Sequence, residues 1–422
     1  MPVIASLHGR EILDSRGHPT VAARCELAGG ASGSASVPSG RSTGRAEAVE
    51  LRDGDPTRYG GLGCRKAAAG IAREVNRALS GSEFGSQAEL DGALVKLDGT
   101  ADKSRLGANA LLAVSLAFAR AAAADRGIPL YRYFADLRAV HLRALPRLTV
   151  NLFSGGRHAG GQVPIQDVLV APLAASSIDA SLSTTFAVYQ SAAELVSTKY
   201  AMRLLRADEG GLAPPCGTAE AMLEDAVSAI ESAGYLPGRD VALAVDVAAS
   251  HFYENARYRL DNRLLSGAEM VGQLAGWLDR YPIVSLEDGL AEDDWEHWRV
   301  LVEAARGRVL VLGDDLLCTN PARIERAIAD RAATALLVKV NQIGTLTEAA
   351  EACRLARAAG WRLTVSARSG ETEDDWLADL AVGWDADQIK VGSITQSDRL
   401  AKYNRLLAIE TETGLPVRAW SA

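Results

Sequence analysis

The chain has 422 residues, of which 48% are apolar, so it is long enough for a barrel of about 250 residues plus a second domain. Its net charge of −8 and pI near 5.4 leave no basic footprint, so neither nucleic acid nor an anionic membrane surface is expected as a partner. The five cysteines are scattered without C-x-x-C spacing, which disfavours a disulfide framework or a zinc site.

The N-terminal stretch MPVIASLHGREILDSRG acquires charge too early for a signal peptide. No apolar stretch approaches the ~18 residues of a membrane span without a charged residue, so we expect a soluble, cytoplasmic protein. Only seven of the 45 cationic residues are lysines, yet Lys339 and Lys390 both lie at the end of an apolar run. Because a buried lysine can lose its proton and arginine does not, this contrast points to a functional Lys339.

Residues 1–135 have the pattern of an α+β domain. Alternating runs at 20–27 and 33–39, separated by Gly-rich turns, predict an antiparallel meander. Apolar residues at helical spacing predict a helix over 109–127. The turn-rich segment 37–45 is interpreted as either an ordinary turn or a mobile lid that closes on a ligand.

The second domain, residues 141–422, has the pattern of a barrel, and 141–156 leads into it. Short apolar runs alternate with helical patterns at intervals of roughly 20 to 40 residues, as in a parallel barrel. Helices are predicted at 181–206 and 217–234, and helix starts at Asn320-Pro321 and Thr345. The predicted strands are 165–173, 241–246, 282–288, 308–315, 335–342, 361–370 and 387–392.

Carboxylates close three consecutive strand-like runs: Asp246, Glu287 and Asp314. Because strand ends of a barrel open onto one pocket, these oxygens predict a site for a hard cation such as Mg²⁺. A metal and the neighbouring Lys390 would lower the pKa of Lys339, which makes Lys339 the candidate general base. The set suits removal of a proton next to a carboxylate, with the metal stabilising the enolate.

Other positions offer possible contacts to a ligand. Arg368 and Ser369 form a turn that could bind phosphate or carboxylate. Glu209 lies in a loop bounded by Gly and Pro, which is either a plain turn or the location of a catalytic acid. His158, between glycines, could contact ligand, although a lone loop histidine is more often solvated. His251 and His297 are interpreted as surface or supporting residues and receive no role.

Long motifs distributed through nearly the whole chain resemble the enolase family. The resemblance implies a meander-and-helix domain capping a (β/α)₈ barrel of the α/β class, and usually a homodimer. The motifs include ILDSRGHPTV (12–21), VPSGRSTGRAEAVELRDGD (37–55), DEGGLAP (208–214), SLEDGLAEDDW (285–295) and SARSGETED (366–374).

The same resemblance implies the roles of individual residues. Asp246, Glu287 and Asp314 would bind a first Mg²⁺, and Ser42 in the lid loop would join a second. Lys339 would remove the C2 proton of 2-phosphoglycerate. The remaining predicted contacts are Lys390 with the substrate carboxylate, Glu209 with the departing 3-hydroxyl, and Arg368 and Ser369 with the phosphate.

The chain departs from the enolase pattern at one end of the site. It has Ala367 where enolases have His, Asp167 where they have Glu, and Arg41 where they have Ala. Gly289 replaces a Pro, and Arg157 could add a positive charge beside His158. The metal ligands and the base are kept, so the departures predict a rebuilt leaving-group end that still takes a small anionic phosphorylated or phosphonate substrate.

Three functions are compatible with this pattern. The first is a specialised enolase homologue that uses the room at Ala367 and the charge of Arg41 for a larger anionic partner, as in carboxyphosphonoenolpyruvate synthase of phosphinothricin-type phosphonate biosynthesis. The second is an ordinary enolase that dehydrates 2-phosphoglycerate to phosphoenolpyruvate. The third is a non-catalytic binding protein that keeps the fold.

Overall fold

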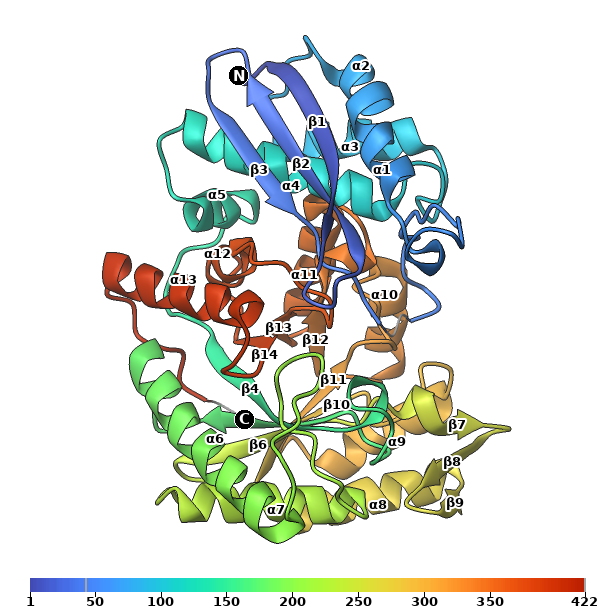
Figure 1. Ribbon diagram of the computed structural model, residues 1–422, viewed down its shortest axis with the longest axis vertical. Coiled ribbons are helices and arrows are strands. Elements are labelled where there is room, and N and C mark those ends of the chain that lie inside the picture. Colours follow the sequence, from blue (N-terminus) through green and yellow to red (C-terminus); the bar gives the residue numbers. More distant parts are fainter. Residues whose placement is uncertain (42–43, 421–422) are drawn as a thin grey trace.

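The N-terminal part begins with a three-stranded antiparallel sheet in the order β1-β2-β3. The computed structural model describes residues 1–41 and 44–420. Helices follow the sheet and, in Figure 1, the whole unit lies above the barrel. The elements are β1 (Ile4–Leu13), β2 (Pro19–Leu27), β3 (Ser32–Ser36), α1 (Arg65–Gly70), α2 (Asn76–Leu79), α3 (Gln87–Asp98), α4 (Ala108–Asp125) and α5 (Leu130–Leu137).

Helix α4 forms the core of this domain by packing on β2 and β3. Its alanine-rich surface lets the backbones come close, and a Cβ on Gly33 would stand 2.4 Å from the carbonyl oxygen of Ala117. α4 is long and apolar enough to cross a membrane by length and composition, but 83% of it is buried within the protein. That burial is typical of a core helix.

Eight strands close a barrel, which confirms the predicted fold class of an α/β barrel with an N-terminal capping domain. Its order is β10-β11-β12-β13-β14-β4-β5-β6. The strands are β4 (Arg147–Ser154), β5 (Asp167–Pro172), β6 (Val241–Asp246), β10 (Ile283–Glu287), β11 (Leu310–Gly313), β12 (Ala335–Val338), β13 (Arg362–Ser366) and β14 (Gln388–Gly392).

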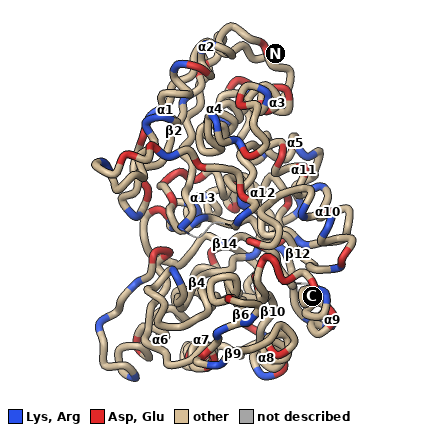
Figure 2. Tube along the Cα trace, turned by 90° about the vertical axis from the view of Figure 1, so that its right-hand side faces the viewer, with Lys and Arg blue, Asp and Glu red and all other residues tan. Residues whose placement is uncertain are grey.

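Helices surround the barrel, and a small hairpin sheet projects beside α8. Figure 2 shows Lys and Arg interspersed with Asp and Glu along both parts of the chain. The helices are α6 (Ile178–Tyr200), α7 (Ala219–Ser232), α8 (Gly267–Arg280), α9 (Trp295–Ala305), α10 (Pro321–Asp330), α11 (Leu346–Ala358), α12 (Trp376–Gly383) and α13 (Ser397–Thr413); the hairpin strands are β7 (Tyr253–Glu254), β8 (Arg257–Leu260) and β9 (Arg263–Leu265).

One strand differs from the all-parallel pattern that the sequence predicted. β5 runs antiparallel to both β4 and β6. Antiparallel neighbours need no crossover helix, and the segment between β4 and β5 contains only the short 3₁₀ turn η3 (Gly156–His158). The reversal places Asp167, the first residue of β5, opposite Asp246, the last residue of β6. Asp167 therefore lies at the rim where the parallel strands end.

Local cap chemistry sets where several helices begin. Asn320 caps α10 by accepting from the N–H of Ala322, and Thr345 caps α11 by accepting from Glu348, as predicted. α6 is shorter than its predicted range, because it ends at Tyr200 with Ala201 in the left-handed conformation.

Alternation along the strands selects the side chains that face the inside of the barrel. An internal cavity is lined by Ser285 and Glu287 of β10 and by Gln388 and Lys390 of β14. Residues two apart on a strand share a face. Because Ser285 points into the barrel, Glu287, two residues further along β10, also points inward. The same reasoning applies to Gln388 and Lys390.

Arg399 of α13 connects this helix to the loops that follow β13 and β14. It is fully buried, and its guanidinium donates to the carbonyl oxygens of Arg368 (2.7 Å), Val391 (2.9 Å) and Ser369 (2.8 Å). Two of these carbonyls belong to the predicted phosphate-binding turn. Arg399 therefore holds the backbone of that turn in place through these hydrogen bonds.

Replacing Arg399 with Met should lower the free energy of unfolding by about 3 kcal/mol, because buried carbonyls lose a charged donor. Urea unfolding of the full chain measures this change. Arg354→Met is the matched control, since Arg354 is exposed and, among the described residues, pairs with Glu351 on α11 alone. It should change stability by less than about 0.5 kcal/mol. Equal losses in the two variants would contradict the role assigned to Arg399.

Candidate active site

The first cluster at the barrel rim is centred on Lys390 of β14. Its Nζ donates to Asp246 Oδ2 at 2.8 Å and to Glu287 Oε1 and Oε2 at 2.9 and 2.8 Å. All three side chains are buried. Gln166 Nε2 donates to the same oxygen of Asp246 at 3.0 Å. The structure therefore brings together Lys390 and two of the three predicted metal ligands.

The second cluster pairs Lys339 with Asp314. The residues directly follow β12 and β11, and Lys339 Nζ donates to Asp314 Oδ2. Gln342 Nε2 donates to Asp314 Oδ1 at 2.8 Å, and Thr319 Oγ1 accepts from the Lys339 backbone N–H at 2.9 Å. The predicted base and the third predicted ligand are thus held at adjacent strand ends.

The two clusters carry more negative than positive charge. Burial and the nearby charge of Asp246 raise the pKa of Glu287 well above its usual range. Burial would also raise the pKa of Asp246, but the ammonium of Lys390 outweighs it and lowers that pKa. Three carboxylates thus face two ammonium groups. A divalent cation would relieve this repulsion.

The sequence predicted a lowered pKa for Lys339, but this arrangement raises it. Burial and the like charge of Lys390 do lower it, but the carboxylate of Asp314 outweighs them and the pKa of Lys339 is raised. The sequence indicated cations near Lys339 but did not reveal its direct ion pair with Asp314. In this geometry the ion pair favours the protonated form of Lys339.

The donors of Asp246, Glu287 and Asp314 fit Mg²⁺ in their chemistry, since all are buried carboxylate oxygens. Their spacing is set by the lysines, because Asp246 and Glu287 turn to Lys390 while Asp314 turns to Lys339. Among the described residues, the groups with ligand atoms within 4.8 Å of one another are His158, Asp167 and Glu209, and separately Asp288, Asp314 and Asp315.

A third group occupies the other side of the rim. Asp167 accepts from Ser154 Oγ at 2.5 Å and pairs with His158 Nδ1 at 3.0 Å. His158 Nε2 lies 3.9 Å from Glu209 Oε1, and Asn151 Nδ2 donates to Glu209 Oε2 at 3.2 Å. The solvated interpretation of His158 is wrong, since the side chain is only 6% exposed.

Electrostatics in this third group favour a proton on the histidine. Burial lowers the pKa of His158, but the charges of Asp167 and Glu209 outweigh it and raise that pKa. Burial raises the pKa of Glu209, and the positive charge of His158 reverses the shift, so the Glu209 pKa is lowered. Burial raises the pKa of Asp167, and the positive charge of His158 offsets that shift only in part.

The predicted phosphate-binding turn is held by partners that the sequence did not reveal. Arg368 pairs with both oxygens of Glu47, at 2.9 Å from Nη1 and 3.2 Å from Nη2. Ser369 Oγ accepts from the guanidinium of Arg16 at 3.1 Å and from the backbone N–H of Arg41 at 3.0 Å. Glu47 lies within the quoted segment 37–55, but nothing in its spacing identified its partner.

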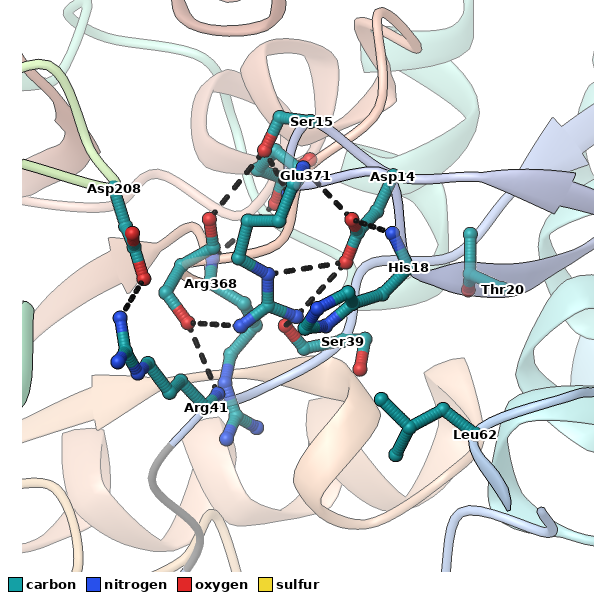
Figure 3. Close-up of polar contacts among 12 residues, drawn as sticks. Asp14, Ser15, His18, Thr20, Ser39, Arg41, Leu62, Asp208, Arg368 and Glu371 are labelled. Atoms are coloured by element: carbon teal, nitrogen blue, oxygen red, sulfur yellow. Dashed lines mark hydrogen bonds and ion pairs between the residues drawn. The ribbon is translucent and has the colours of Figure 1, made fainter. Parts of the chain in front are cut away.

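The departures from the enolase pattern meet beside this turn. Ala367 is buried, and its N–H donates to the carbonyl oxygen of Lys390 at 2.8 Å. Arg41 reaches across the rim, where its Nη1 donates to Asp208 Oδ2 at 2.6 Å (Figure 3). Ser42, the predicted ligand of a second Mg²⁺, lies outside the described residues.

The structure is a closed barrel with a capping domain, and buried lysines pair with carboxylates at its strand ends, which is where barrel enzymes carry their active sites. The family model described as "Enolase, C-terminal TIM barrel domain" matches residues 142–418, and "Enolase, N-terminal domain" matches residues 4–134. The chain belongs to the enolase family, which confirms the resemblance and an enzyme of enolase type.

His251 lies near the mouth of the site and makes no side-chain hydrogen bond among the described residues; its Nδ1 is buried without a partner. Burial and the positive charge of Arg157 lower the pKa of His251 to about 4, and His158 acts in the same direction. Asp246 and Asp314 oppose the shift without reversing it. His251 is thus held neutral near pH 7.

This shift predicts a pH dependence of stability. In the unfolded chain a histidine has a pKa near ~6.5, whereas the pKa of folded His251 is about 4. Between these two pH values the unfolded chain binds a proton at this residue and the folded chain does not. The contribution of His251 should therefore leave stability unchanged above about pH 6.5 and reduce it as the pH falls. Urea unfolding from pH 7 to pH 4.5 should show a shallower loss for His251→Gln than for the parent.

The exposed His8 supplies the control, because His8→Gln should keep the pH slope of the parent. Identical slopes for His251→Gln and the parent would show that His251 titrates normally in the folded chain.

Proposed function

We propose that this enolase-family chain is a Mg²⁺-dependent enzyme acting on a 2-phosphoglycerate- or phosphoenolpyruvate-type substrate, with a specialised reaction like that of carboxyphosphonoenolpyruvate synthase in phosphonate biosynthesis. The main support is the pairing of Lys339 with Asp314 and of Lys390 with Asp246 and Glu287 at the rim. Lysine and carboxylate at these positions supply a base, an electrostatic partner and oxygen donors in one pocket.

Lys339 is proposed to remove the proton next to the substrate carboxylate. With Asp314 holding Mg²⁺ in place of Lys339, burial and the positive charges of Arg368 and Lys390 would lower the pKa of Lys339 and leave it unprotonated. It is buried at the end of β12, and its ion pair with Asp314 fixes the direction of Nζ. Lys390 would contact the substrate carboxylate, and Asp246, Glu287 and Asp314 would hold Mg²⁺. When bound, Mg²⁺ supplies positive charge that stabilises the enolate. Arg368 and Ser369 would hold the phosphate, and the charge of Arg368 acts on both Lys339 and Asp314 at the rim.

Glu209 is proposed to deliver a proton to the group that leaves C3. The raised pKa of His158 and the lowered pKa of Glu209 favour a proton on the imidazole rather than on Glu209. Glu209 would therefore draw its proton from His158, which Asp167 holds in place at 3.0 Å. This arrangement keeps acid chemistry at the leaving-group end.

The specialised reaction is supported by two departures from the enolase pattern, Ala367 and Arg41. A methyl group at Ala367 replaces an imidazole and leaves more room, and Arg41 adds a cation that contacts the loop carrying Glu209. Extra room and extra positive charge favour a larger anionic reactant at C3. Ordinary dehydration of 2-phosphoglycerate is the second candidate, and the intact group of His158, Asp167 and Glu209 favours it.

The base is tested first. The full chain with Mg²⁺ and 2-phosphoglycerate in D₂O should exchange the C2 proton, and Lys339→Ala should slow exchange by about 10² to 10⁴-fold or more, because the base is gone. Proton and phosphorus NMR time courses measure exchange and phosphoenolpyruvate together. Lys199→Ala breaks a Lys–Asp pair between α6 and α7 and serves as control. Exchange that persists in Lys339→Ala, or none in the parent, would refute the proposal.

The rebuilt end is tested by restoring the enolase residues. Ala367→His combined with Arg41→Ala should raise the rate of phosphoenolpyruvate formation by about tenfold or more, since a polar group returns beside the leaving hydroxyl. The phosphorus NMR time course compares the double variant with its parent. A parent that already dehydrates rapidly, with no gain in the variant, would favour an ordinary enolase.

A further inference from the structure

A cavity of about 510 Å³ lies at the barrel mouth, outside the clusters of the candidate site. Its walls come from three separate segments: Arg41, the loop between β4 and β5, and the turn after β6 that carries His251 and Phe252. The loop contributes Arg157 and several glycines. The volume is large enough for a small organic anion.

The cavity adjoins the leaving-group end. Arg157 directly precedes His158, which pairs with Asp167. The backbone N–H of Arg41 donates to Ser369 Oγ at 3.0 Å, and its guanidinium pairs with Asp208 beside Glu209 (Figure 3). A molecule in the cavity would therefore lie next to the groups proposed to act at C3.

The charges around the cavity are positive and incompletely paired. None of the described residues that line it is acidic. Arg157 is exposed and makes no side-chain hydrogen bond or ion pair with any residue in the described parts of the chain. Arg41 uses Nη1 to bind Asp208 and retains further N–H groups for a ligand.

His251 and Phe252 form a wall of the cavity that carries no acidic group. Among the described residues, no side chain makes a hydrogen bond with the imidazole of His251. Gly160 and Gly161 line the cavity without a side chain. Both have positive φ, at 84° and 80°, so a Cβ on either would strain the loop.

We infer that this Arg41–Arg157 cavity binds the phosphonate or phosphate group of a second reactant while the first substrate occupies the rim. The inference rests on the proposed function and adds to it the place and chemical class of the second reactant. Guanidinium groups bind tetrahedral oxyanions through paired N–H donors, which suits two arginines that line the same cavity.

The test uses phosphonoacetate as the probe. It is titrated calorimetrically into the full chain with Mg²⁺ and saturating 2-phosphoglycerate. The parent should bind it, and Arg157→Gln should weaken that binding by at least about tenfold, while its affinity for 2-phosphoglycerate stays unchanged. Arg157→Lys keeps the charge and should recover part of the loss. Arg77→Gln on α2, an exposed arginine at the far end of the capping domain, should behave as the parent.

Distinct outcomes separate this inference from the proposed function. Equal phosphonoacetate affinity in parent and Arg157→Gln, or competition between phosphonoacetate and 2-phosphoglycerate, would overturn the cavity assignment while C2 proton exchange still supports the function. Failure of the parent to bind 2-phosphoglycerate would overturn both. Weakened phosphonoacetate binding in Arg157→Gln together with weakened 2-phosphoglycerate binding would show a general effect on the rim and would also count against the cavity.

Discussion

Burial of charge at the barrel rim is the constraint on which the rest of this structure depends. Taking an isolated ion out of water costs several kcal/mol, so Lys390 and Lys339 can be buried only with partners. The partners come from different strands, and β6 and β10 must pair with Asp246 opposite Glu287 for both to reach Lys390. A slip of one residue would turn either carboxylate to the outer face of the barrel.

The reversed strand β5 extends this rim on one side. Because β5 begins where its neighbours end, Asp167 joins the charged groups, and the preceding loop folds over the mouth with His158 and Arg157. The rim thus keeps its lysines and carboxylates, while Arg41 and Ala367 depart from the family pattern. Ala367 follows β13, which lies between the strands that lead to Lys339 and Lys390. These positions can differ independently because each strand terminus contributes its own side chain to a common scaffold.

Much of the local structure was predictable. The run 241–246 coincides with β6, and Asn320 and Thr345 cap their helices, because strand alternation and cap chemistry act over a few residues. The motifs indicated the enolase family correctly. The direction of β5 and the burial of His158 were not predictable, because they follow from which strands become neighbours in the closed barrel.

The sequence by itself determined the barrel, its capping domain and the residue types available at the strand ends, since these follow from periodicity and motif order. Only the tertiary structure decided the partners of those residues. Arg368 binds Glu47, 321 positions away, and Asp314 raises the pKa of Lys339, whose cationic neighbours alone pointed the other way. Ion pairs and cavities depend on distances between segments far apart in the chain, and short-range patterns carry no record of those distances.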